Sequence, residues 1–106
     1  MSDTYWHLLL ANSMVDLAKN SKTKSAAYAL LVAFEELIDA YASLEDKHFH
    51  EEYLEEGWKK RREWMEEHNL IDKWERLIYL CKKVIEGRED HLKEMFDTIE
   101  SLKISL

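Results

Sequence analysis

The feature that most constrains this fold is an apolar run over residues 26–44, AAYALLVAFEELIDAYASL. Its large residues recur at alternating steps of three and four, which places them on one face of a helix. A second stripe, of small residues, lies beside that face and lets another helix backbone approach closely. Because the run has two apolar faces, we expect a central helix with neighbours on both sides. The large residues include Leu30, Phe34, Leu37, Tyr41 and Leu44, and the small ones include Ala26, Ala29, Ala33, Ala40 and Ser43.

Three carboxylates interrupt this run. Glu35 and Asp39 share a narrower face, which predicts a solvent-exposed strip. Glu36 falls within the small-residue stripe, where a carboxylate needs a cation or hydrogen-bond donors because burying it unpaired is costly. Glu36 is therefore the first candidate for a functional or structurally specific polar residue. The same acids interrupt the run before it reaches the roughly 20 apolar residues that a membrane-spanning helix needs.

The scarcity of glycine and proline indicates the fold class. Proline is absent and only Gly57 and Gly87 are present, whereas strands need turns that these residues commonly form. With 35% charged residues and helical spacing throughout, the prediction is an all-α bundle of four or five helices in a single domain over residues 1–106. Helices are expected over residues 4–19, 26–44, 49–68 and 70–86, with a last stretch to about residue 103. The expected helix caps are Ser2 or Asp3, Ser21 or Thr23, and Asp72.

The C-terminal third carries a seven-residue apolar repeat. Its register passes through Gly87 without slipping, which favours one long helix, with a helix pair broken at Gly87 as the alternative. Such a strip is longer than the partners available within a chain this short. We therefore predict a homodimer in which part of the strip packs against a second copy. The partner-facing residues are Ile71, Trp74, Ile78, Ile85, Leu92 and Ile99, and Leu106 continues the repeat.

The charge balance excludes some classes of protein. Fifteen Lys and Arg face 22 Asp and Glu, for a formal net charge of −7. This argues against a protein whose main role is to coat nucleic acid or an anionic membrane, because both reward clustered positive charge. The single cysteine, Cys81, is expected as a small core residue. No secretory or transit signal is apparent, so a cytoplasmic location is expected.

A local exception to the acidic character is the run WKKRREW over residues 58–64. Its cations could contact phosphates while its tryptophans stack on bases. The alternative is a solvated helix with a ladder of acid–base pairs four residues apart, such as Arg62 with Glu66, and tryptophans that belong to the core or to an interface. The candidate binding residues are Trp58, Lys59, Lys60, Arg61 and Trp64.

Five histidines raise the question of a metal site. Glu45 and His48 have the spacing found in di-iron bundles, but such bundles take this motif from two helices and the chain has one copy. His48 and His50 would also point to different sides of a helix. The sequence therefore predicts no metal site and no cofactor.

Arg62 and His68, separated by five residues, form the candidate catalytic pair, and Arg88 with His91 is a looser version of it. Histidine can act as a general acid or base near neutral pH, and arginine can stabilise the charge that develops on a phosphorane.

The segment Ala33-Phe34-Glu35-Glu36-Leu37, followed by Ala40 within two antiparallel helices, resembles the front half of HEPN-superfamily domains, nearest the abortive-infection AbiV-type branch. The resemblance covers residues 5–68. It implies a small helical bundle, often homodimeric, in a family where many members are metal-independent ribonucleases with an arginine–histidine motif at the dimer cleft. Other members are inactive RNA-binding or adaptor modules. Two positions depart from the family pattern: Glu63 follows the arginine where a small polar residue is common, and Asp39 replaces a lysine.

Two functions follow from these patterns. The first is a non-catalytic interaction module, HEPN-like, that binds protein or RNA. The second is a metal-independent endoribonuclease of a toxin or defence system, in which Arg62 stabilises the scissile phosphate, His68 acts as acid or base and Glu36 orients the arginine. The nuclease requires these three side chains to converge in a cleft, across the dimer axis.

Overall fold

The computed structural model describes residues 2–104 and contains five α-helices and two short 3₁₀ helices, with no strand in that range. The predicted all-α bundle is confirmed. None of the helices over this range is long and apolar enough to cross a membrane. The elements are α1 Ser2–Lys19, α2 Thr23–Ser43, η1 Phe49–Glu51, α3 Leu54–Glu67, α4 Ile71–Ile85, η2 Glu89–His91 and α5 Leu92–Ile104.

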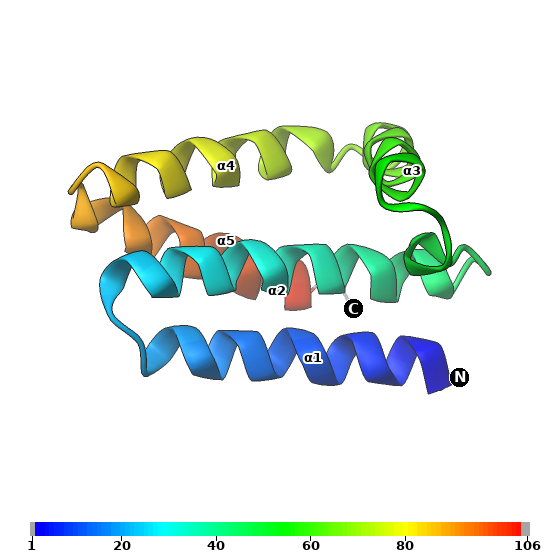
Figure 1. Cartoon of the computed structure of the whole chain (residues 1–106), viewed down its shortest axis with the longest axis horizontal. Coiled ribbons are helices and arrows are strands. Elements are labelled where there is room, and N and C mark those ends of the chain that lie inside the picture. Colours follow the sequence, from blue (N-terminus) through cyan, green and yellow to red (C-terminus); the bar gives the residue numbers. More distant parts are fainter. Residues whose placement is uncertain (1, 105–106) are drawn as a thin grey trace.

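Helix α2 is central, as its two apolar faces predict. Helix α1 lies antiparallel along one side of it, α4 and α5 cover the other side, and α3 crosses the direction of the other helices near the C-terminal end of α2 (Figure 1). The small-residue stripe faces α1, since His7 bonds Glu36 and Thr4 bonds Ser43 across this contact. The large residues Leu30, Phe34 and Leu37 form the other face and are almost fully buried.

The predicted helix caps are wrong. Ser2 and Asp3 lie inside the first turn of α1. Lys22, in extended backbone, is the N-cap residue of α2. The Ser21 hydroxyl donates to the Leu17 carbonyl oxygen at the end of α1 and not to α2. Helix α4 begins at Ile71, with Leu70 at its N-cap, so that Asp72 also lies inside the first turn.

The helix predicted over residues 49–68 is broken before α3. Phe49 lies in η1 and is 5% exposed, so the chain turns there to bring its ring into the core. Gly57 admits this turn: a Cβ at residue 57 would lie 2.8 Å from the Phe49 carbonyl oxygen. The missing side chain therefore allows a close backbone contact between η1 and α3.

The C-terminal strip is a helix pair and not one continuous helix. Gly87 has a φ of 107°, and the amides of Gly87 and Arg88 bond the carbonyls of Val84 and Lys83. This is a Schellman helix stop, which glycine forms at little cost. Asn69, with a φ of 59°, ends α3 in the same way, as predicted.

Folding back at Gly87 gives the heptad residues partners within the chain. Trp74 is 8% exposed and Ile99 is fully buried, so these two residues of the predicted dimer face belong to the core of one copy. The other four predicted interface residues are partly buried, and Leu106 lies outside the described residues. Those four are Ile71, Ile78, Ile85 and Leu92.

Candidate functional site

A buried ion pair holds α3 on α2. Arg61 donates from Nε to Asp39 Oδ1 at 2.8 Å and from Nη2 to Asp39 Oδ2 at 2.9 Å. Arg61 is 5% exposed and Asp39 is 3% exposed. The predictions that Asp39 lies in a solvated strip and that Arg61 is a surface cation are therefore wrong. The physical reason is the crossing of α3, which covers this face of α2.

Glu35, which lies beside this pair, is also partly covered by α3. Burial raises the pKa of Glu35, and the attraction of Arg61, whose Nη2 lies 3.7 Å from Glu35 Oε2, offsets this only in part. Of the two residues predicted as a solvated strip, Glu35 is therefore partly covered and Asp39 is buried.

The two tryptophans of the basic run, Trp58 and Trp64, also contact other residues of the chain. The Arg61 guanidinium carbon lies 4.9 Å from the Trp58 ring centroid, and Trp58 stacks on Trp74 with centroids 5.2 Å apart. Trp64 is 4% exposed, and its indole Nε1 donates to Glu45 Oε1 at 2.9 Å. Neither ring is presented to solvent as a stacking surface for bases.

The cations of the run pair with different acids. Lys60 Nζ lies 2.6 Å from Glu52 Oε1. Arg62 Nη2 lies 3.7 Å from Glu75 Oε2, so its ion pair is with α4 and not with the expected Glu66. Of the five predicted binding residues, only Lys59 is exposed. The structure therefore does not bring the run together as a nucleic-acid surface.

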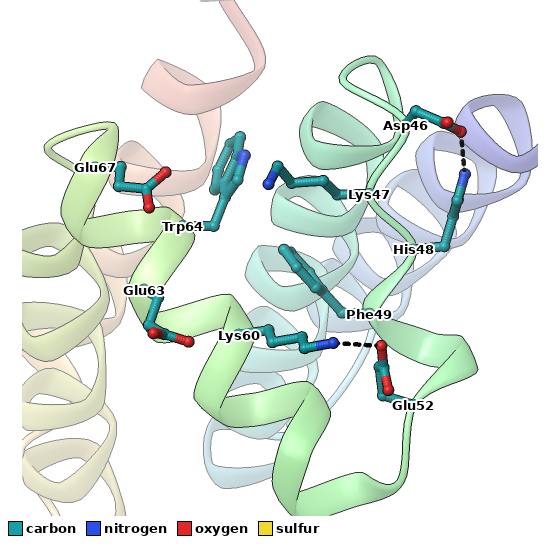
Figure 2. A pocket seen from close by; sticks show the side chains of 9 residues that line it. All are labelled: Asp46, Lys47, His48, Phe49, Glu52, Lys60, Glu63, Trp64 and Glu67. Atoms are coloured by element: carbon teal, nitrogen blue, oxygen red, sulfur yellow. Dashed lines mark hydrogen bonds and ion pairs between the residues drawn. The ribbon is translucent and has the colours of Figure 1, made fainter.

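A surface pocket of about 370 Å³ lies between α3 and the segment that leads into it (Figure 2). Lys60 turns to Glu52 and His48 turns to Asp46, while Lys47 extends toward the ring of Trp64. Four acids and two lysines line the pocket, so its wall does not favour a phosphate or another anion. The lining residues are Asp46, Lys47, His48, Phe49, Glu52, Lys60, Glu63, Trp64 and Glu67.

The candidate catalytic residues do not meet within one chain. Arg62 pairs with Glu75, His68 with Glu45, and Glu36 with His7. No hydrogen bond or ion pair over residues 2–104 joins any two of the candidates. A single copy therefore does not assemble the arrangement that the nuclease needs.

His68 has a defined local role. Its Nδ1 donates to the Trp64 carbonyl oxygen at 2.8 Å, and its Nε2 lies 3.0 Å from Glu45 Oε2. The ring stacks on Trp64 with centroids 3.9 Å apart. Both partners only accept, so both ring nitrogens must carry a proton, and the imidazolium is the form that fits. Desolvation lowers the pKa of His68, but the bonds to Trp64 and Glu45 outweigh it, and the pKa is raised above 6.5.

We expect Glu45→Gln to bring the pKa of His68 back toward 6.5, because the charged partner is lost. The pKa of His68 is higher in the folded than in the unfolded chain. Its contribution to stability is therefore complete below about pH 6.5 and is lost as the pH rises through the folded-state pKa. An NMR titration of the His68 ring protons measures the shift, with Glu66→Gln as the control. An unchanged pKa in Glu45→Gln would contradict the assignment.

A cluster of titratable side chains joins the start of α1 to η1. Asp3 Oδ2 accepts from His48 Nδ1 at 2.7 Å, and Asp3 Oδ1 lies 2.9 Å from His50 Nε2. His7 Nδ1 lies 2.6 Å from Glu36 Oε2, and its Nε2 lies 3.5 Å from Asp3 Oδ1. We call these five residues the N-terminal cluster. They come from α1, α2 and the segment around η1.

The electrostatics of the N-terminal cluster are those of a carboxylate surrounded by imidazoles. Burial raises the pKa of Asp3, but the hydrogen bonds from His48 and His50 and the nearby His7 outweigh it and lower the pKa. The bond to Asp3 is the main cause that raises the pKa of His48. His7 is 7% exposed, and its Nε2 is buried without a hydrogen-bond partner among the described residues.

Sequence reasoning found only parts of this cluster. It placed Glu36 in the small-residue stripe and required a donor for it, and that donor is His7. It considered Glu45 with His48 only as a metal motif, which it set aside, and Glu45 binds Trp64 and His68 instead. A usable signal was present: His7 lies 12 residues before the end of α1 and Glu36 13 residues after the start of α2, so a short loop brings them opposite each other.

The geometry thus shows a structural ion pair at Asp39 and Arg61, a polar surface pocket, and the N-terminal cluster. The HEPN resemblance stays a prediction that rests on the residues quoted for it. Comparison of the chain with protein-family models, with curated proteins and with solved structures finds no match.

Proposed function

We propose that this protein is a non-catalytic, HEPN-like interaction module that binds a protein partner, namely a second copy of itself, through the outer face of α1. The observation that carries the proposal is the scarcity of charge on that helix between its first turn, with Asp3, and its last residue, Lys19. Between Thr4 and Ala18, Asp16 is the only acidic or basic residue apart from His7, in a chain that is 35% charged. The proposal places the module in the cytoplasm, where the Cys81 thiol stays reduced.

The outer face of α1 is apolar and uncovered. Trp6, Leu10 and Leu17 follow one another at steps of four and seven and are 57%, 44% and 52% exposed. The inner face, with Ala11 and Val15, is buried against α2. A helix that is apolar on both faces is normally covered on both, and α1 lies at the edge of the molecule (Figure 1). The outer face therefore has the character of a protein interface.

Charge supports a protein partner and not an RNA or a membrane. Residues 2–18 contain no lysine or arginine, so α1 offers nothing to attract phosphates before its last turn. Two copies with a net charge of −7 repel each other, and an uncharged face is where they can approach at least cost. A twofold contact also uses the same patch on both copies, as a single uncovered helix provides.

This proposal moves the predicted dimer contact from the C-terminal strip to α1. Trp74 and Ile99 are packed inside one copy and cannot also face a second. Tyr28 and Val32 of α2, 56% and 43% exposed, are further apolar side chains outside the core. The dimer itself stays a prediction.

The endoribonuclease alternative rests on the spacing of Arg62 and His68 and would need the dimer to bring them to Glu36 of the other copy. The contacts of these residues with Glu75 and Glu45 give no support for this arrangement. Cleavage of RNA in the presence of a chelator, lost in His68→Ala, would overturn the interaction-module proposal in favour of the nuclease.

We expect the wild-type chain to be dimeric in a light-scattering or sedimentation concentration series, and the Leu10→Glu/Leu17→Glu variant to be monomeric. Burying a leucine contributes about 1.5 kcal/mol or more, so loss of two raises the dimer Kd by at least about a hundredfold. The matched control is Leu54→Glu, because Leu54 is 79% exposed on α3 and should leave the dimer intact. A monomeric wild type, or a dimeric double variant, would refute the α1 interface.

A further inference from the structure

We infer that Asp3, His7 and His50 form a Zn²⁺ site that ties the start of α1 to η1. One ligand atom from each of the three residues lies within 4.8 Å of the others. Asp3 Oδ1 is 2.9 Å from His50 Nε2 and 3.5 Å from His7 Nε2. Zinc held at about 2.0–2.2 Å by nitrogen and oxygen ligands keeps those ligands about 3.3 Å apart. The observed spacings lie on either side of that value.

The buried Nε2 of His7, which has no hydrogen-bond partner among the described residues, is the independent observation that points to a cation. Its Nδ1 is bonded to Glu36, which leaves Nε2 turned toward Asp3, 7% exposed as a residue and without a hydrogen-bond partner in the described chain. In a neutral imidazole that donates from Nδ1, Nε2 carries a lone pair. A lone pair facing a carboxylate is unfavourable, and a metal ion between the two converts it into a bond.

The residues around the three ligands are those that metal sites use to orient them. Metal-bound histidines usually donate their other ring nitrogen to a carboxylate, which sets the tautomer and raises the basicity of the ligand. Glu36 has this position on His7. His48 bonds the second oxygen of Asp3 at 2.7 Å and so directs the first oxygen toward His7 and His50. Glu51 and His48 form a separate group with His50.

The donor set selects the class of metal. Two imidazole nitrogens and one carboxylate oxygen suit Zn²⁺ and its first-row neighbours, whereas Mg²⁺ and Ca²⁺ prefer oxygen ligands alone. The expectation of no metal site came from residues 45–50 taken by themselves. His48 and His50 lie on one short segment. Asp3, which is 45 residues from His48 and 47 from His50, contacts both and joins this segment to α1. The site uses Asp3 and His7 of α1, whereas the proposed interface uses Trp6, Leu10 and Leu17 of the same helix.

The test is calorimetric titration of ZnSO₄ into the full chain, freed of chelator and of any purification tag. We expect one Zn²⁺ per chain, a higher melting temperature with Zn²⁺ than with Mg²⁺, and shifts of the His7 and His50 ring protons in NMR spectra. The His50 side chain is 40% exposed, so His50→Ala should fold normally and weaken zinc binding by more than about a hundredfold. His91→Ala, outside the cluster, is the matched control.

The Glu36→Gln variant tests whether Glu36 orients His7, because it leaves all three proposed ligands in place. It keeps the size of the side chain but removes the charge behind His7, and we expect zinc affinity to fall about 10–100-fold. Absence of zinc binding by the wild type would overturn the site and show a cluster held by protonated histidines alone. Binding that survives His50→Ala unchanged would also overturn it, as evidence of adventitious binding elsewhere.

Discussion

Replacing Arg61 by methionine is expected to lower the free energy of unfolding by about 3–5 kcal/mol. The methionine keeps much of the aliphatic packing but leaves the Asp39 carboxylate, 3% exposed, without the two bonds of 2.8 and 2.9 Å that neutralise it. An uncompensated buried charge costs far more than the pair contributes. Denaturant unfolding followed by circular dichroism measures the change.

Two further variants make this expectation specific. Arg62→Met, next in the chain with a side chain 47% exposed, should change stability by no more than about 0.5 kcal/mol. Arg61→Met combined with Asp39→Leu should recover most of the loss, because apolar residues can replace a buried ion pair when both charges are removed. A loss of less than about 1 kcal/mol in Arg61→Met would show that water reaches Asp39, contrary to the packing observed.

The second large effect is expected at Trp74. Its ring packs against Phe34 and stacks on Trp58, with centroids 5.4 and 5.2 Å away, and the residue is 8% exposed. Trp74→Ala removes a large buried side chain where α4 meets α2 and α3, and should cost about 3–5 kcal/mol. The free energy of unfolding in denaturant is the measurement.

Tyr53→Ala is the control for Trp74→Ala. Tyr53 is aromatic but 91% exposed, and its removal should change stability by no more than about 0.5 kcal/mol. Similar losses at the two positions would contradict the assignment of Trp74 to the core. Trp74→Phe should recover part of the loss, because a smaller ring can still stack on Trp58 and Phe34.

The same two regions show where sequence reasoning succeeded and where it failed. The stripe with Leu30, Phe34 and Leu37 predicted the central helix correctly because helical periodicity is a local property. The exposure of Asp39 could not be predicted, because its position beside the apolar faces is equally compatible with solvent or with a crossing helix. Only the angle of α3 over α2 decides between them (Figure 1).

The prediction of one long C-terminal helix was wrong for a related reason. The heptad register continues through Gly87, yet the backbone reverses there because a φ of 107° is accessible to glycine. Periodicity records which residues are apolar, but it does not record which surface they face. The reversal brings α5 against α4 and α2, so that Ile99 and Trp74 find partners within one chain.

The sequence by itself determined the helical class, the central place of residues 26–44, the stop at Asn69 and the need of Glu36 for a donor. These follow from periodicity, backbone preference and the cost of a buried charge, all of which act over a few residues. The tertiary structure alone decided that Asp39 and Arg61 are buried together and that Asp3, His7 and His50 meet. Such contacts join segments that are distant in the chain, and they depend on how the helices cross and on where the chain reverses.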